Sequence, residues 1–180
     1  MKNSWKQEMY SVLKCILFAF ILVLVCRNFF FTPSVVHGES MSPTFEDGNK
    51  IILSKIGDIK RFDMIVFHAP DSDNNYIKRV IGVPGDTISV KDDILYVNGK
   101  AFEEPYLTEN KKEASTIKLT GDFTLQERTG ETTVPKHSLF VLGDNRLYSK
   151  DSRIFGLVNK NSVIGKVVFR IYPLNEIGLP

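Results

Sequence analysis

Residues 76–86 read YIKRVIGVPGD, and this stretch decides the fold class. Its apolar and β-branched residues form a short run that the turn formers Pro84 and Gly85 end, which is typical of a β-strand. Lys78 is unexpected in the middle of such a run. Its simplest explanation is a charge on a strand at the edge of a sheet.

Short apolar runs of the same kind recur on both sides of this stretch. They are rich in β-branched and aromatic residues, and Gly, Pro, Asn and Asp separate them. They lie at residues 51–53, 64–67, 94–97, 139–142 and 163–172. Asn98-Gly99, which follows one of these runs, is a strong signal for a two-residue hairpin. We therefore expect a mainly β domain with an antiparallel sheet.

The stretch 103–135 departs from this pattern. It is polar, and it gathers charged residues such as Glu103, Glu104, Lys111 and Lys112. We expect an exposed, variable insertion there rather than part of the core.

Length, charge and cysteine content limit the class of protein. A chain of 180 residues has room for one anchor segment and one domain of ordinary size. The formal net charge of +2 gives no global attraction to nucleic acid, so we expect no nucleic-acid partner. Cys15 and Cys26 would lie about 16 Å apart on a helix, beyond disulfide reach, and they leave the compartment open.

Residues 10–31 are almost wholly apolar. A helix of this length spans the ~30 Å hydrocarbon core of a bilayer. Lys14 and Arg27 would extend toward the two interfaces, and Thr32-Pro33 would end the helix. We expect one N-terminal transmembrane helix over residues 10–32, which makes the lipid bilayer a predicted partner.

The flanking charges predict the orientation of this helix. Lys2, Lys6 and Lys14 precede the uninterrupted apolar run, and Arg27 follows it. Because positive charge is retained on the cytoplasmic side, we expect residues 1–9 in the cytoplasm. Residues 33–180 would form an extracytoplasmic β domain, in a single-pass protein of the cell membrane.

An alternative is that residues 1–38 form a cleaved signal peptide, with a charged n-region and an apolar h-region. The residues after the apolar run, RNFFFTP, do not form an A-x-A-like cleavage site. Val36 and Gly38 satisfy the small-residue positions only weakly. Retention as an anchor is therefore favoured.

Two further segments carry residue types that hydrolases use. Ser40 lies in VHGESMSPT, residues 36–44, shortly after the proline that ends the anchor. Residues 143–153 read GDNRLYSKDSR and follow the apolar run 139–142 directly. Taken singly, the first is a turn serine and the second a polar loop.

Together with the lysine strand, these segments resemble three sequence boxes of bacterial type I signal peptidases. The boxes are S-M-x-P-T, K-R-x-x-G-x-P-G-D and G-D-N-R-x-x-S-x-D-S-R, and they occur here in the same order after a single anchor, as in single-anchor Gram-positive members. The resemblance covers residues of about 33–100 and 138–172. It implies an antiparallel β-sheet protease domain and a membrane-bound serine endopeptidase that removes N-terminal signal peptides from secreted preproteins.

The chemistry of a serine and a lysine fits this resemblance. A serine hydroxyl is a poor nucleophile unless a base takes its proton, and a lysine whose pKa is lowered by burial can do so. We therefore expect Ser40 to be the nucleophile and Lys78 the general base. The resemblance implies that Ser149 orients the lysine and that Asp151 and Arg153 form a supporting pair.

The sequence signals for the other members of the expected site are less specific. We hypothesise that Asp144 supports the site by charge pairing with Arg79. The oxyanion hole would use backbone N–H groups such as that of Ser40. No metal or other cofactor is expected, because Cys, His and carboxylate residues do not cluster at ligand spacing.

The resemblance also implies how the substrate binds. An extended segment of a preprotein signal peptide would add to a strand edge, with shallow apolar pockets for the small residues at −1 and −3.

Two positions depart from the family pattern. Phe62 precedes Asp63 where the family usually has glycine, so we expect a different turn there that does not touch the chemistry. Some members carry, two residues before the nucleophile, a serine that helps to bind the oxyanion; this chain has Gly38 there, as many single-anchor members have glycine.

The sequence offers three alternative functions. A Ser-His-Asp hydrolase would use His37, His68 or His137, but the nucleophile elbow would need glycine at Ser42. A penicillin-binding or β-lactamase reading rests on STIK at 115–118, SDN at 72–74 and RTG at 128–130, which occur in the wrong order. A non-enzymatic β module that binds a partner along a sheet edge leaves the serine and lysine contexts unexplained.

Overall fold

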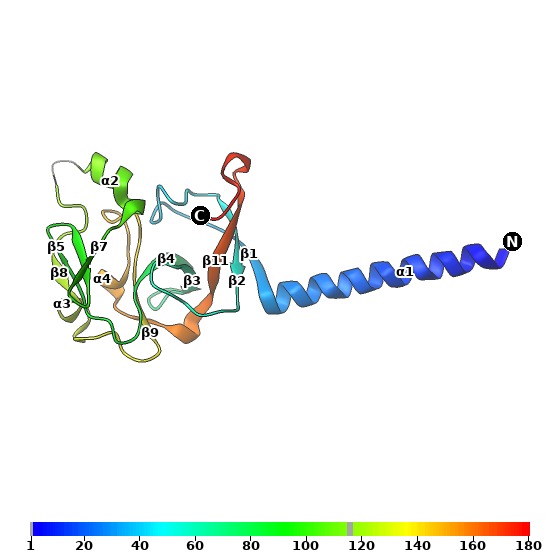
Figure 1. Cartoon of the computed structure of the whole chain (residues 1–180), viewed down its shortest axis with the longest axis horizontal. Helices are drawn as coiled ribbons and strands as arrows, with labels where there is room; N and C mark the ends of the chain where they lie inside the picture. Colours follow the sequence, from blue (N-terminus) through cyan, green and yellow to red (C-terminus); the bar gives the residue numbers. More distant parts are fainter. Residues whose placement is uncertain (1, 115–116) are drawn as a thin grey trace.

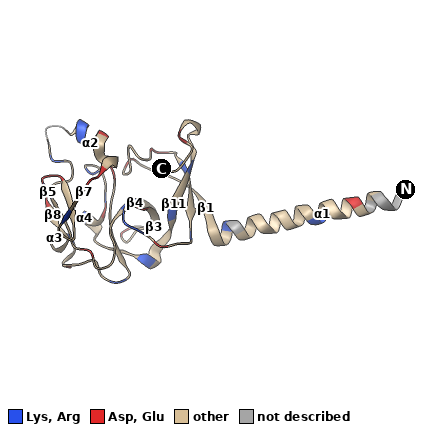
Figure 2. Ribbon diagram, viewed as in Figure 1, with Lys and Arg blue, Asp and Glu red and all other residues tan. Residues whose placement is uncertain are grey.

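The computed structural model describes residues 2–114 and 117–180. It consists of a long N-terminal helix that projects from a β domain (Figure 1). Helix α1 spans Lys2–Val25 and continues as the π-helical turn Cys26–Phe30, after which strand β1 spans Phe31–Val35. Within it, Gln7–Phe30 is long and apolar enough to cross a membrane. After Glu8, Lys14 is the one charged residue of α1 up to Val25 (Figure 2).

The helix ends earlier than the sequence suggested. Thr32-Pro33, expected to end it, already belongs to β1 and pairs with Leu53 and Ile52 of the neighbouring strand. A proline is tolerated there because β1 is an edge strand, where one row of backbone N–H groups needs no partner.

The larger sheet has seven strands in the order β1-β2-β11-β3-β4-β9-β10. Its other strands are β2 Lys50–Ser54, β3 Met64–His68, β4 Asn75–Gly82, β9 Ser138–Leu142, β10 Val158–Asn159 and β11 Val163–Tyr172. Every pairing in it is antiparallel. The prediction of a mainly β, antiparallel fold is confirmed, and each apolar run named above forms a strand.

A smaller sheet, in the order β7-β6-β5-β8, lies at the end of the domain far from α1 (Figure 1). Its strands are β5 Ile88–Lys91, β6 Ile94–Val97, β7 Lys100–Phe102 and β8 Phe123–Thr124. Asn98 and Gly99 connect β6 to β7 with φ values of 53° and 74°. The predicted two-residue hairpin is confirmed, because a type I′ turn needs positive φ at both positions.

Short helices connect the strands. They are η2 Pro105–Leu107, α2 Thr108–Glu113, α3 Leu125–Thr129, α4 Ser152–Phe155, η3 Lys160–Ser162 and η4 Leu174–Glu176. α2 is preceded by the buried Leu107, which fixes the start of the helix in a small apolar cluster with Ala114 and Leu119.

The expectation that residues 103–135 are exposed rather than core needs correction. Phe123, Leu125 and Val134 are buried in the same cluster as strands β5, β6 and β9. Glu104 is also buried. Apart from Glu104, the charged residues of this stretch face solvent, while a few apolar residues at intervals complete the core.

The packing of residues 31–38 favours retention of the N-terminal segment. β1 forms an edge of the large sheet, and Val36, which follows it, is buried. Val36 N–H donates to the Asn49 carbonyl at 2.8 Å, and Gly48 N–H donates to the Val36 carbonyl at 2.9 Å. Cleavage after Gly38 would remove this strand from the sheet.

Candidate active site

Ser40 and Lys78 are in direct contact in the β domain. Lys78 Nζ lies 2.7 Å from Ser40 Oγ and also donates to the Ile77 carbonyl at 2.9 Å. Burial lowers the pKa of Lys78 to about 8, against the opposing charges of Asp151 and Asp144. With this pKa about a tenth of the lysine is neutral at pH 7 and about half at pH 8, and the neutral amine can accept the serine proton.

The two residues are held by different parts of the fold. Lys78 lies on β4, which is paired with β3 and β9 inside the large sheet, and its side chain is only 3% exposed. Ser40 lies in the turn that follows β1, where Met41 and Phe45 are fully buried and Phe45 N–H donates to the Met41 carbonyl. These two buried neighbours fix the serine opposite the strand.

Arg79 and Asp144 form the ion pair that we hypothesised. Arg79 Nε donates to Asp144 Oδ1 at 2.8 Å and Nη2 donates to Oδ2 at 2.6 Å, a bidentate geometry. Thr44 Oγ1 donates to the same carboxylate at 2.6 Å. Since Asp144 is fully buried, this pairing satisfies a charge that would otherwise be costly.

Asp151 and Arg153 form a second bidentate pair. Arg153 Nε and Nη2 each donate to the carboxylate at 2.8 Å. Asp151 also contacts the backbone, since Gly143 N–H donates to its Oδ2 at 3.0 Å. The carboxylate also accepts from Arg153 N–H at the start of α4. Asp151 thus joins the two ends of the loop 143–153.

Ser149 is buried beside Gly143. The hydrogen bond to Lys78 that the resemblance implies is absent here: within the described residues Ser149 Oγ has no hydrogen-bond partner. A Cβ at Gly143 would lie 2.1 Å from Ser149 Oγ and 2.4 Å from the Ser40 carbonyl oxygen. The glycine therefore lets the serine loop and the loop 143–153 approach each other.

A groove of about 700 Å³ lies next to this site. Two backbone segments line its sides, 34–38 after the start of β1 and 74–77 at the start of β4. The apolar side chains Ile51 and Val66 also line it. β1 is the last strand of its sheet, and β4 pairs with β9 only from Arg79 onward, so both segments offer strand edges to the groove.

The two positions that depart from the family pattern both have left-handed backbone. Gly38 has φ of +79°, and its N–H donates to Asp47 Oδ1 at 2.8 Å. Phe62 has φ of +71°, a conformation in which glycine is unstrained, and its ring packs against Phe102 and Tyr106. The turn at Phe62 thus keeps the backbone shape that a glycine would give.

Sequence reasoning missed the connections between the site and residues 104–120. Arg146 is fully buried; it donates to Glu104 Oε1 at 2.5 Å and to Thr120 Oγ1 at 2.9 Å. Asn110 donates to two backbone carbonyls of the site segments. Arg146 stands inside the third box, which is a signal that could have been used, whereas nothing around Glu104 or Asn110 marks them.

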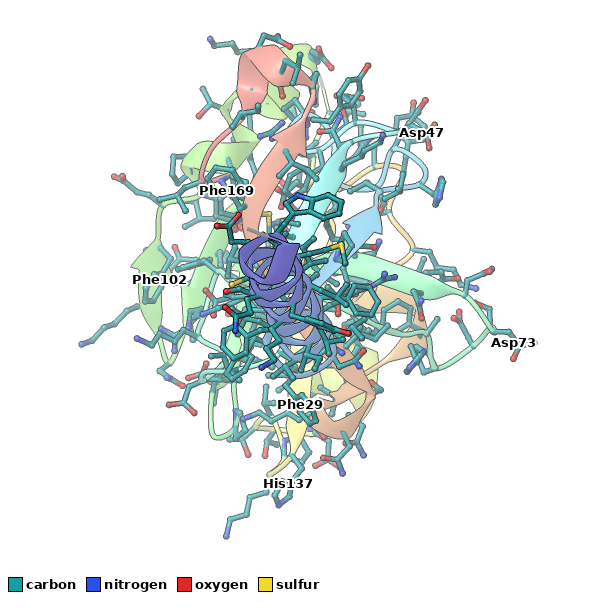
Figure 3. The ribbon with its side chains drawn as sticks, turned by 90° about the vertical axis from the view of Figure 1, so that its right-hand side faces the viewer. Phe29, Asp47, Asp73, Phe102, His137 and Phe169 are labelled. Carbon is teal, nitrogen blue, oxygen red and sulfur yellow. The ribbon has the colours of Figure 1, made fainter. Side chains whose placement is uncertain are left out.

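The residues of the rival readings lie elsewhere. His37, His68 and His137 are all exposed, and His37 faces Asp47 rather than the serine. Viewed along α1, His137 lies at one margin of the domain and Asp73, of the S-D-N match, at the outer end of the β3–β4 hairpin (Figure 3). Ser115 and Thr116, of the S-x-x-K match, lie outside the described residues. Among those described, no group of three or more His, Cys, Asp or Glu could hold a metal ion.

Comparisons with known proteins agree with one another. The family described as signal peptidase, peptidase S26, matches residues 9–172. The chain is 54% identical over 162 residues to a signal peptidase I of Bacillus caldolyticus, with 88% of each protein covered. It is 41% identical over 179 residues to signal peptidase IB of Staphylococcus aureus, covering 95% of this chain and 93% of the relative. A crystal structure of a signal peptidase I from Enterococcus faecalis is 44% identical, with a TM-score of 0.60, and the match covers 62% of this chain and 98% of that one.

Proposed function

The chain belongs to the signal peptidase family, peptidase S26, and from this membership we propose that Ser40 and Lys78 carry out its reaction. It is a membrane-anchored serine endopeptidase that removes signal peptides from preproteins. The observation that carries the assignment of residues is the 2.7 Å contact between Lys78 Nζ and Ser40 Oγ, with the lysine buried and its pKa lowered to about 8.

In the proposed mechanism, neutral Lys78 takes the Ser40 proton as the serine oxygen attacks the carbonyl carbon of the scissile bond. The oxyanion of the tetrahedral intermediate is bound by backbone N–H groups, including that of Ser40. The lysine then gives its proton to the leaving amine, which is the new N-terminus of the mature protein. A water molecule, deprotonated by the same lysine, hydrolyses the acyl-enzyme.

The supporting residues act on the two loops around this pair. Arg79 and Asp144 anchor the turn after Ser40 through Thr44, which donates to the same carboxylate. Asp151 and Arg153 fix the loop that carries Ser149. Ser149 is the nearby hydroxyl that orients the lysine once substrate is bound, because catalytic hydrogen bonds often tighten only in the complex.

The substrate binds as an extended segment in the groove between 34–38 and 74–77. Its backbone adds to the two strand edges, as in other cases of β-strand addition. The apolar floor, with Ile51 and Val66, offers shallow pockets that suit small side chains at −1 and −3. The burial of those side chains selects the cleavage site.

The anchor lies across the membrane with residues 1–9 in the cytoplasm and residues 33–180 outside, as the three lysines before the apolar run predict. The exposed apolar side chains of α1 support its contact with lipid rather than protein. The lipid bilayer is therefore the second partner. Protease added to intact, wall-stripped cells should digest residues 33–180, and full protection of that domain would refute this orientation.

The decisive test of the reaction uses the full chain in detergent or liposomes with a preprotein substrate. N-terminal sequencing of the product should identify cleavage after small residues at −3 and −1. Ser40→Ala should abolish both cleavage and labelling by a serine-directed acylating inhibitor. Labelling that persists in Ser40→Ala would assign the nucleophile to another serine.

A further inference from the structure

Asn110 lies on α2, outside every motif of the sequence, yet its side chain reaches into the site. Asn110 Nδ2 donates to the Ser42 carbonyl at 3.0 Å and to the Asp144 carbonyl at 2.8 Å. The first acceptor lies two residues after the nucleophile. The second directly follows Gly143, in the loop that carries Ser149. One amide group thus bridges the two segments whose relative position sets the geometry of the site.

Further hydrogen bonds join the same two segments, the turn of Ser40 and the loop 143–153. Asn145 N–H donates to the Ser40 carbonyl at 3.1 Å, and Asn145 Nδ2 donates to the Glu39 carbonyl at 3.1 Å. At Gly143 the segments are close enough that a Cβ would clash with the Ser40 carbonyl oxygen. A small shift of either segment therefore moves Ser40 relative to Lys78.

Buried contacts hold the segment that precedes Asn110 in place. Leu107, just before α2, is fully buried, and Glu104 is held by the buried Arg146. The ring of Tyr106, between them, lies 4.0 Å from the Arg79 guanidinium. Residues 104–110 are thus attached to the site at several points, and the amide of Asn110 is fixed relative to the strands.

We propose that Asn110 is a positioning residue for catalysis, which holds the turn of Ser40 against the loop 143–153 by donating to both backbones. This inference rests on the proposed function of Ser40 and Lys78. The bridge needs two N–H donors on one nitrogen, which an amide supplies and a carboxylate of the same shape does not. Asn110 does not line the substrate groove, so its effect is on the reaction step rather than on substrate binding.

The test compares full-length Asn110→Asp and Asn110→Ala with wild type, using a preprotein substrate. The matched control is Lys112→Ala, an exposed residue on the same helix. Turnover is expressed per active site, counted by complete titration with a serine-directed acylating inhibitor, and thermal melts report the fold. Because sub-ångström displacement of a nucleophile is costly, kcat should fall about tenfold or more in both variants, with KM within about twofold.

Asn110→Asp should show the largest loss of kcat, since its carboxylate faces two carbonyl oxygens. The kcat of Lys112→Ala should match that of wild type. Unchanged kcat per titrated site in Asn110→Asp would overturn the inference, as would a loss of activity that only tracks the loss of folded protein. A rise in KM at constant kcat would also overturn it. Failure of the wild type itself to cut the preprotein would defeat the proposed function instead.

Discussion

Lys78 and Arg79 are neighbours on β4, yet their side chains take part in two different interactions. The lysine amine contacts Ser40 Oγ, whereas the arginine guanidinium makes a bidentate pair with Asp144. Successive residues of a strand point to opposite faces, so one strand supplies both a base and a structural cation. Asp144 is paired with the arginine, and within residues 2–114 and 117–180 no carboxylate hydrogen-bonds to the lysine amine and holds its proton.

The first prediction tests the base. Lys78→Arg should be as inactive as Lys78→Ala, because the guanidinium cannot lose its proton in the accessible pH range. Preprotein cleavage by the purified variants measures this, with circular dichroism to verify folding. Lys100→Arg, an exposed exchange of the same kind, should keep full activity. Substantial cleavage by folded Lys78→Arg would eliminate the Ser40–Lys78 mechanism, and His37 would become the base to test.

The pH dependence of activity follows from the lowered pKa. Lys78 must be neutral to accept a proton, so kcat/KM should rise with pH through about 8 and level off above it. A profile measured across this range on a preprotein whose own groups do not titrate there gives the apparent pKa. A profile that rises only near the ordinary pKa of lysine would mean that the amine is not desolvated.

The same pKa makes a prediction about stability. Below pH 8 Lys78 is charged in both states and its burial costs the folded protein about 3 kcal/mol. Between about 8 and 10.5 the unfolded chain binds the proton that the folded chain has lost, so the free energy of unfolding rises with pH. Lys78→Met should therefore be more stable than wild type at pH 7, and the difference should shrink toward pH 10.5. Chemical denaturation at several pH values measures it, and a pH-independent difference would contradict it.

Gly38→Ser is expected to fold less stably because the position has φ of +79°. The strain should lower the free energy of unfolding by about 1 kcal/mol. There is open space around a Cβ at this position, so turnover per folded molecule should stay within about tenfold of wild type. Gly38→Ala carries the same strain without the hydroxyl and is the matched control. Turnover lower by orders of magnitude in folded Gly38→Ser would show that the oxyanion site has been misplaced.

Gly143→Ala should inactivate the enzyme while leaving most of the fold intact. Its methyl group would press on Ser149 and on the Ser40 carbonyl oxygen, and the resulting displacement of the nucleophile should cost about 100-fold in kcat. Ser149→Ala in the same background removes the clash with Ser149 Oγ but leaves those with its Cβ and with the Ser40 carbonyl oxygen, so activity should not return. Recovery in the double variant would mean that only the hydroxyl of Ser149 is displaced.

Much of the fold could be predicted because its signals are local. The β-branched run around Val80 and the Asn98-Gly99 turn carry their conformation in their own residue types. The end of the anchor was less predictable, because a proline can end a helix and can also lie on an edge strand. Pro33 lies on the edge strand β1, which forms by pairing with β2. Residues 103–135 were misjudged for a similar reason: Phe123 and Val134 are single apolar residues whose burial depends on partners far away in the chain.

In the site, Ser40 and Lys78 stood in recognisable contexts, and the pairing of Arg79 with Asp144 could be hypothesised from charge. The hydrogen bonds of Asn110 and the buried partner of Arg146 could not, since they depend on where a polar stretch folds back onto the sheet. The positive φ of Phe62 could not be predicted either, because phenylalanine has no preference for that conformation.

No residue intervenes between the helical turn that ends at Phe30 and the strand that begins at Phe31. In the proposed topology, with α1 across the bilayer, this direct connection holds the groove beside β1 at a set distance from the membrane surface. The proposed enzyme would then select a bond by its distance from the membrane surface as well as by the small side chains proposed at −1 and −3. Two preproteins with identical cleavage motifs but apolar segments of different length would be cut at different rates. A flexible spacer inserted after Phe30 would erase that distinction.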